Sequence, residues 1–263
     1  MKHAWTNFGA ALERSPFRLR DPQPIGETPE GAIAYHHSRQ SRQIPEQRND
    51  AIGNIRTAAL SFQNMHMFGD LLLNYLKARK SVFIDRLNWH ICEADGMEFD
   101  QYDTPFCKWV VLVEFGEIVG GVRLLPTTAT CGIYSYMLRD AHLGLLDDFP
   151  TDVLFIHPPV ESQAWEASRF FIKDSIPGAR RLMIQSLLFT EMSRIAEENG
   201  ARYILGIVPA IWARWARRLN VTATPIGAPF TIDGSRSQSV LFQVGSLNRS
   251  EKAVTSSLSG SRS

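Results

Sequence analysis

The apolar positions of the chain follow a helical period first and strand periods afterwards. In residues 70–84 the apolar side chains recur at helical spacing. The members of this set are Leu71, Leu72, Tyr75, Leu76 and Phe83. Because this spacing places them on one side of a helix, residues 70–84 are predicted to form an amphipathic helix that packs by that side.

Two apolar runs farther along the chain predict a β-hairpin. Residues 108–115 (KWVVLVEF) are rich in β-branched side chains, residues 116–117 form a turn, and residues 118–125 (IVGGVRLL) return as the partner strand. Two adjacent glycines in the returning run, Gly120 and Gly121, indicate a β-bulge or a close approach of another segment to the backbone.

The second half of the chain alternates between strand and helix patterns. A long helix is expected to stop at Asn199-Gly200, since glycine just past the last periodic residue is typical of a helix end. Pro209 is expected in the first turn of the next helix. The predicted elements are, in order, a strand at 165–172, a helix at 180–198, a strand at 201–208, a helix at 210–219, and strands near 221–226 and 239–244.

The two ends of the chain lack this periodicity. Residues 1–55 mix Arg, Gln, Pro and Ser without a repeating apolar pattern, and residues 247–263 are rich in serine. We therefore expect a flexible N-terminal extension at 1–55, one globular domain at 56–246 and a flexible tail at 247–263.

Composition excludes several classes of protein. The chain has 263 residues, of which 44% are apolar and 21% charged, and its net charge of +1 argues against nucleic acid as a main partner. No apolar run approaches the roughly 18 to 20 residues that span a bilayer, and the N-terminus has no apolar stretch typical of a secretory signal. The three cysteines form no C-x-x-C pair and no zinc pattern, so a reduced cytoplasm is the simplest location.

Two arginines interrupt segments that otherwise read as buried strands. Arg123 lies between Val122 and Leu124, and Arg169 precedes Phe170 in an equally apolar run. A charge in such a segment must be paired or must face a cleft.

These arginines belong to four short strings that together carry a specific signal. In the first string, three residues separate an arginine from a phenylalanine, and five residues separate that phenylalanine from a tryptophan. An acidic pair three apart, an arginine in RLLPT and a W-E-x-S-R-F string follow. The residues are Arg79, Phe83, Trp89, Asp100, Asp103, Arg123, Glu166 and Arg169. In this order they resemble the acyl-homoserine lactone synthase family, the autoinducer synthases, over roughly residues 65–219.

The resemblance implies a fold and a reaction. The fold is α/β (α+β), an acyl-CoA N-acyltransferase-like three-layer sandwich around a central twisted mixed sheet. In the reaction the amine of S-adenosylmethionine attacks an acyl thioester, and ring closure then yields an acyl-homoserine lactone and methylthioadenosine. The thioester is carried by an acyl carrier protein or by coenzyme A, and S-adenosylmethionine is a substrate, so no cofactor is expected.

The resemblance also implies roles for the motif residues. Glu166, with Arg169, is the catalytic candidate: a base that takes the amine proton directly or through water. The alternative is a structural ion pair between the two. The residues assigned to S-adenosylmethionine are Arg79, Phe83, Trp89, Asp100, Asp103 and Arg123. A core position for Trp89 and solvation for the two aspartates remain open alternatives.

Two further groups of residues complete the expected site. His142 stands where the family usually has a phenylalanine, and with Trp212 and Trp215 it is assigned to the acyl pocket. Basic residues near the start of the long helix suit the acidic surface of an acyl carrier protein. They are Lys173, Arg180 and Arg181. The alternatives for the whole chain are an N-acyl amino acid synthase or a non-catalytic module that binds acyl carrier protein.

Overall fold

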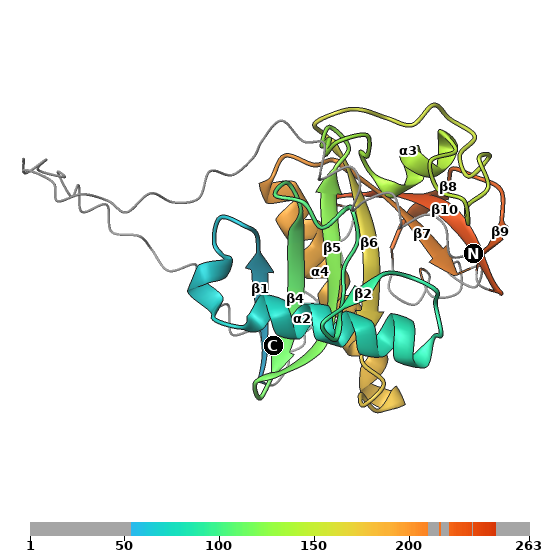
Figure 1. Ribbon diagram of the computed structural model, residues 1–263. Coiled ribbons are helices and arrows are strands. Elements are labelled where there is room, and N and C mark those ends of the chain that lie inside the picture. The colour runs from blue at the N-terminus through green and yellow to red at the C-terminus, as the bar shows by residue number, and fades with distance from the viewer. Residues whose placement is uncertain (1–53, 210–215, 217–220, 233, 246–263) are drawn as a thin grey trace, which may run out of the picture. The chain divides into compact units, whose positions relative to one another are not determined.

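A mixed β-sheet forms the centre of the protein. The computed structural model describes residues 54–209, 216, 221–232 and 234–245 (Figure 1). The strands of the sheet are β1 (Ile55–Leu60), β4 (Lys108–Glu114), β5 (Glu117–Pro126), β6 (Ala164–Ile172), β7 (Tyr203–Pro209), β8 (Ala223–Pro225), β9 (Phe230–Ile232) and β10 (Ser235–Gln243). Their order is β1-β4-β5-β6-β7-β10-β8, with β9 also paired to β10, and only β6 and β7 run parallel.

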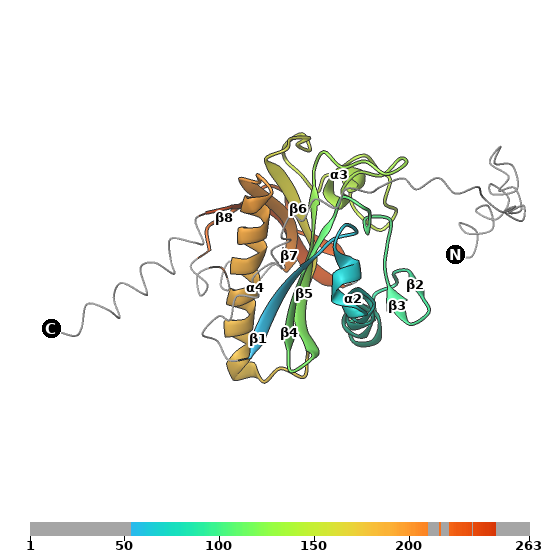
Figure 2. The ribbon, with the colours of Figure 1, turned by 90° about the vertical axis from the view of Figure 1, so that its left-hand side faces the viewer.

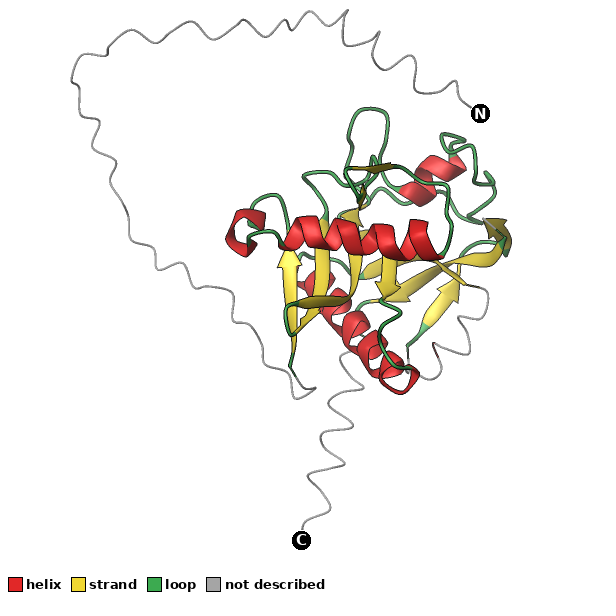
Figure 3. Ribbon diagram, turned by 60° about the horizontal axis from the view of Figure 1, so that its bottom comes forward, coloured by secondary structure: helices red, strands yellow, loops and turns green. Residues whose placement is uncertain are grey.

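Helices cover both faces of this sheet. The long helix α4 (Gly178–Glu198) lies on one face, and α2 (Leu71–Lys80) and α3 (Met137–His142) lie on the other, as Figures 2 and 3 show. Each face has its own apolar core, because strand side chains alternate between the two faces. The expected three-layer α/β fold with a mixed sheet is therefore confirmed.

The smaller elements connect the layers. They are a 3-10 turn η1 (Met65–Phe68), a π-helical turn η2 (Ser81–Arg86) and a two-stranded hairpin of β2 (Glu93–Ala94) and β3 (Met97–Glu98). No helix among the described residues combines the length and the apolar character that crossing a bilayer requires.

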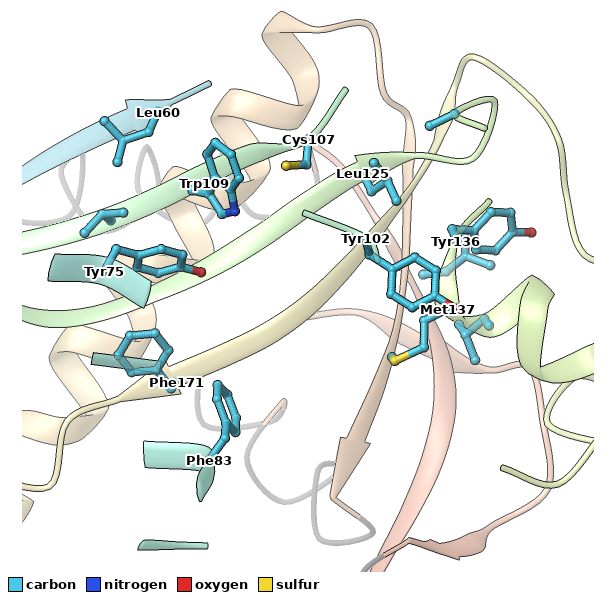
Figure 4. Close-up of a cluster of buried hydrophobic side chains, with 14 of the residues drawn as sticks. Leu60, Tyr75, Phe83, Tyr102, Cys107, Trp109, Leu125, Tyr136, Met137 and Phe171 are labelled. Atoms are coloured by element: carbon cyan, nitrogen blue, oxygen red, sulfur yellow. The ribbon is translucent and has the colours of Figure 1, made fainter. Parts of the chain in front are cut away.

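The predicted hairpin is confirmed as β4 and β5, and its glycines have the expected purpose. The register shifts between Leu112 and Val113, which marks a bulge in β5 next to Gly120. At Gly121 the backbone approaches α2 so closely that an added Cβ would lie 2.5 Å from the Tyr75 ring and 3.1 Å from the Val110 carbonyl oxygen. Figure 4 shows Tyr75 in the core on this face of the sheet.

Several boundaries differ from the sequence-based prediction. Strand β1 was not predicted, and it begins with the buried Ile55, one residue inside the expected extension. Pro209 ends β7 rather than opening a helix. A proline is tolerated there because only the last residue pair of the β7–β10 ladder is affected. The expected helix at 210–219 lies outside the described residues except for Ala216, which is helical and buried. Most of the expected extension and the whole expected tail also lie outside them.

The parallel strands β6 and β7 pair over only four residues each. The pairing runs from Ala164 with Tyr203 to Ala167 with Gly206. Beyond that point β6 pairs with β5 alone, and there its register shifts: Arg169 and Phe170 together oppose the single residue Val122. This bulge begins where the two parallel strands separate.

The close approach at Gly121 makes a quantitative prediction. Gly121→Ala should lower the free energy of unfolding by about 1 to 3 kcal/mol, because the new methyl group must displace the buried Tyr75 ring. Gly178→Ala at the start of α4 is the matched control, because an added Cβ there meets no described atom of another segment within 4 Å, and it should be neutral or slightly stabilising. Urea unfolding of both variants checks this, and equal midpoints would contradict the packing argument.

Candidate functional site

The helix α2 and the π-helical turn η2 that follows it place two motif residues, Arg79 and Phe83, on the same side as Tyr75. Tyr75, Arg79 and Phe83 are spaced by four residues, and all three are buried against the sheet. After Lys80 the helix widens into the π turn η2. The main chain then folds back, so that the N–H of Trp89 donates to the carbonyl of Phe83 at 2.9 Å. The two rings stack with centroids 4.9 Å apart, which explains the spacing of the first motif string.

Three arginines and three carboxylates form one network on the α2 face of the sheet. The arginines come from α2, β5 and β6, and the carboxylates come from the segment that contains β3 and the following loop. The members are Arg79, Arg123, Arg169, Glu98, Asp100 and Asp103. Formal charges therefore balance at three positive and three negative. This balance is what makes burial of the whole group tolerable.

Arg79 is fully buried and binds two carboxylates. Its Nη1 and Nη2 donate to Asp103 at 2.7 and 3.0 Å, a bidentate pairing, and its Nε donates to Glu98 at 2.5 Å. The indole N–H of Trp109 adds a third bond to Asp103 at 3.0 Å. Asp103 is therefore held by α2 and by β4 at the same time.

Arg123, in β5, is also fully buried and also binds two carboxylates. Its Nη1 and Nη2 donate to Asp100 at 2.5 and 3.2 Å, its Nη1 lies 3.0 Å from Asp103, and its Nε donates to the Ser168 hydroxyl. Its guanidinium also lies over the ring of Tyr102, 5.6 Å from the centroid. The requirement that a charge in an apolar strand be paired is thus met.

Arg169 reaches the network because of the bulge in β6. It has a φ of +55°, an uncommon value for a residue with a side chain. The extra residue lets Arg169 point to the same face as Ser168, whereas strict alternation would send it toward α4. Its Nε then donates to Glu98 at 3.0 Å and its Nη2 to Asp100 at 2.8 Å. The guanidinium covers the Phe83 ring at 5.7 Å.

The acidity of the two aspartates follows from this packing. Burial alone would raise the pKa of Asp100 and of Asp103. The guanidinium groups, Arg123 foremost, outweigh burial and hold both pKa values below the usual range. Asp103 pairs with Arg79 and Arg123 and Asp100 pairs with Arg123 and Arg169, so the alternative of solvation as simple loop residues is wrong.

Glu166 lies outside the network. Its carboxylate is fully buried and accepts the backbone N–H groups of Met137 and Leu138 at 2.9 and 2.7 Å. It forms no ion pair with a described residue, so the alternative of a salt bridge to Arg169 is wrong. Burial raises the pKa of Glu166 to about 7, against the lowering effect of the two N–H groups. A carboxylate that gains or loses its proton near neutral pH has the property a general base needs.

Glu98 is the member of the charged network that the sequence-based set of motif residues did not include. It is completely buried, and its two oxygens bridge Arg79 and Arg169. A signal for it was present in the sequence. Three arginines in apolar surroundings need three carboxylates, and with Glu166 held elsewhere, Glu98 in MEFD stands next to the acidic pair.

The remaining predicted residues that the structure describes lie apart from the network. His142, the last residue of α3, has its ring 6.5 Å from that of His157, and Trp212 and Trp215 lie outside the described residues. Arg180 binds Glu114 through both terminal nitrogens, at 2.6 and 3.2 Å, while Arg181 binds Asp174. Lys173 lies 3.8 Å from Glu117 and lines an open hollow of about 280 Å³ with Lys77.

A mixed sheet that separates at β6 and β7, with a buried carboxylate and a charge-balanced arginine network on one face, defines an acyltransferase-like α/β protein. The autoinducer synthase family model matches residues 66–251, and the chain belongs to this family.

The chain is 34% identical over 166 residues to an acyl-homoserine-lactone synthase of Ralstonia solanacearum, which covers 59% of this chain and 74% of the relative. It is 26% identical over 181 residues to the isovaleryl-homoserine lactone synthase of Bradyrhizobium diazoefficiens, covering 67% and 74%. Among solved structures, TofI in complex with an inhibitor and MTA aligns with a TM-score of 0.57 at 26% identity, over 73% of this chain and 96% of that one.

Removing the charge of Glu98 should destabilise the folded protein. Glu98→Gln leaves the fully buried Arg79 and Arg123 and the mostly buried Arg169 with two carboxylates, and we expect the free energy of unfolding to fall by about 3 kcal/mol or more. Glu93→Gln in the same hairpin, whose carboxylate is half-exposed and pairs with Lys80, should change it by less than about 1 kcal/mol. Chemical unfolding of both variants decides the matter, and a nearly unaffected Glu98→Gln would show that charge balance does not hold this network.

Proposed function

We propose that this chain is an acyl-homoserine lactone synthase that transfers an acyl group to S-adenosylmethionine. The amine nitrogen attacks the thioester carbonyl carbon, the thiol leaves, and the amine proton passes to a base. The methionyl carboxylate oxygen then attacks its own γ-carbon, the carbon–sulfur bond breaks, and methylthioadenosine leaves. The observation that carries the proposal is the buried Glu166, whose pKa of about 7 lets it accept that proton at neutral pH.

The network supplies the surface that faces S-adenosylmethionine. Arg79, Arg123 and Glu98 have fully buried side chains and act on the ligand through the others. Asp100, Asp103 and Arg169 retain 7 to 9% exposure, so they are the members that a ligand can reach. Carboxylates there suit the sulfonium and amine, and Arg169 suits the carboxylate.

The stacked pair of Phe83 and Trp89 supports the same placement. Trp89 is only half-buried, so part of its indole is open to a ligand, while its stacking on Phe83 fixes the ring plane. An indole face suits a flat adenine or a sulfonium cation. Because the Arg169 guanidinium lies over Phe83, the aromatic pair and the charged network form one continuous surface.

The acyl thioester is proposed to approach where β6 and β7 separate. Glu166 lies before the last paired residue of β6 and Arg169 just after it, so both flank that point. Lys173, Arg180 and Arg181 are proposed to contact the donor carrier from the start of α4. Each of the three is paired with a side-chain carboxylate, and Arg181 also donates to two backbone carbonyls. An acidic carrier could replace the carboxylates. His142, Trp212 and Trp215 stay assigned to the acyl chain.

The matches to homoserine-lactone synthases favour this reaction over an N-acyl amino acid synthase or a non-catalytic carrier-binding module. The MTA bound to TofI, which is 26% identical, supports methylthioadenosine as a product. Since both substrates are products of cytoplasmic metabolism, the cytoplasm is the proposed location.

The direct test supplies purified protein with S-adenosylmethionine and an acyl thioester, on coenzyme A in one arm and on acyl carrier protein in the other. Mass spectrometry should detect an acyl-homoserine lactone together with an equal amount of methylthioadenosine. Glu166→Gln should stay folded and lower the rate by roughly 100-fold, the scale of losing a general base. An acylated amino acid without methylthioadenosine would contradict the function, and unchanged turnover in Glu166→Gln would contradict the base.

Trp89→Ala should raise the KM for S-adenosylmethionine more than the KM for the acyl donor, because an apolar chain does not need a flat ring to stack on. Trp89→Phe is the matched variant and should keep most of the affinity by preserving an aromatic face. Both KM values are measured beside a melting curve. Equal changes in the two KM values together with a lower Tm would instead make Trp89 a core residue, and a selective effect on the acyl donor would place it in the acyl pocket.

A further inference from the structure

Two buried carboxylates hold the start of the short helix α3 from opposite directions. Glu166 reaches it from β6 and accepts the N–H groups of Met137 and Leu138. Asp140 turns back from inside the helix and accepts the N–H of Ser135 at 2.9 Å and its hydroxyl at 2.6 Å. Both side chains are completely buried. Asp140 therefore fixes the start of α3 through Ser135, and Glu166 binds the backbone N–H groups of the first turn.

We propose that Asp140 is the positioning residue of Glu166, because it fixes the backbone N–H groups that hold the Glu166 carboxylate and places a second negative charge beside it. Asp140 does not touch the substrates in this assignment. It acts through the helix start and through its charge. This assignment rests on the proposed function and names the residue that sets the protonation state of the base.

The surroundings of Glu166 make that second charge effective. Arg123 faces Glu166 from β5, but its guanidinium is already bound by Asp100 and Asp103. The other titratable groups that face it are Asp140, Tyr136 at the cap of α3 and Tyr102 in the loop after β3. With no cation bound to Glu166, a neighbouring negative charge in a dry interior disfavours its ionised form.

The buried Tyr102 lies within reach of the charges of both carboxylates. Its side chain is 2% exposed, and its hydroxyl has no hydrogen-bond partner among the described residues. Figure 4 shows Tyr102 and Met137 in the same buried cluster of side chains. Burial, then the negative charges of Asp140 and Glu166, raise the pKa of Tyr102, so both carboxylates act on the same hydroxyl.

Asp140 thus affects Glu166 in two opposite ways. By ordering the N–H groups of Met137 and Leu138 it favours the ionised carboxylate, and by its charge it favours the protonated one. Substitutions separate the two effects. Asp140→Asn keeps the shape and an oxygen for Ser135 but removes the charge, whereas Asp140→Ala removes both.

The experiment measures the ionisation of Glu166 and the activity as functions of pH. The side-chain carboxyl of Glu166 is titrated by carbon-13 NMR in the wild-type protein and in Asp140→Asn, with Glu166→Gln identifying the signal. Asp147→Asn, in the exposed loop after α3, makes the same charge change as a control. We expect Glu166 to titrate on the order of one pH unit lower in Asp140→Asn and unchanged in the control.

The pH dependence of the activity should shift in the same direction as the titration of Glu166. A base works only when deprotonated, so the rate rises with pH through the pKa of Glu166, and this acid limb should move to lower pH in Asp140→Asn. Titration of the substrate amine is common to both proteins and cancels in the comparison. Asp140→Ala should lose activity at every pH, because Ser135 and the helix start are released.

The outcomes separate this inference from the proposed function. An unchanged Glu166 titration in Asp140→Asn overturns the inference whatever the protein synthesises, and so does an upward shift. A downward shift supports it even if no lactone is made, in which case only the proposed function fails. If Asp140→Asn loses as much activity as Asp140→Ala at all pH values, with Glu166 unmoved, Asp140 is merely structural.

Discussion

The burial of three guanidinium groups against three carboxylates is the interaction on which the rest of this structure depends. An isolated charge in the interior would be expensive, so each arginine of α2, β5 and β6 needs its carboxylates in place. All three carboxylates come from residues 98–103, which form the end of β3 and the loop after it. One short segment therefore fastens the helix layer to two neighbouring strands. It also leaves the side chains of Asp100, Asp103 and Arg169 slightly exposed.

The bulge in β6 decides which side chains share a face. In a regular strand, residues three apart point to opposite faces, and Glu166 and Arg169 would be divided between the two layers. The extra residue reverses the alternation after Ser168, so Glu166 and Arg169 both face α2 and α3, while Phe170 packs against Phe189 of α4. Arg169 adopts a left-handed φ at this point, and its bonds to Glu98 and Asp100 offset the strain. Local backbone strain is thus tied to the placement of the charged site.

The surroundings of Glu166 and those of the network shift carboxyl pKa values in opposite directions. Asp100 and Asp103 stay ionised because cations surround them, and such groups hold charge without exchanging protons at neutral pH. Glu166 is buried, and among the residues that the structure describes only two peptide N–H groups bind it, so its pKa rises to about 7 and it can exchange a proton near that pH. The division between groups that bind charge and a group that moves a proton follows from whether a guanidinium is within reach.

The sequence alone determined the order of elements, the charged and aromatic residues of the motif strings, and the family, because apolar periodicity and residue spacing are properties of the chain itself. Periodicity predicted the α2 region, the β4–β5 hairpin, β6, α4 and β7, and the glycine pair at 120–121 signalled the close approach to Tyr75. It did not predict β1 or the end of β7 at Pro209. Only the tertiary structure decided the partners. Glu166 binds a helix start, which excludes the alternative of an ion pair with Arg169, and Glu98 pairs with Arg169 instead. That choice depends on a one-residue bulge and on contacts between segments about 70 residues apart, which no local pattern in the sequence encodes.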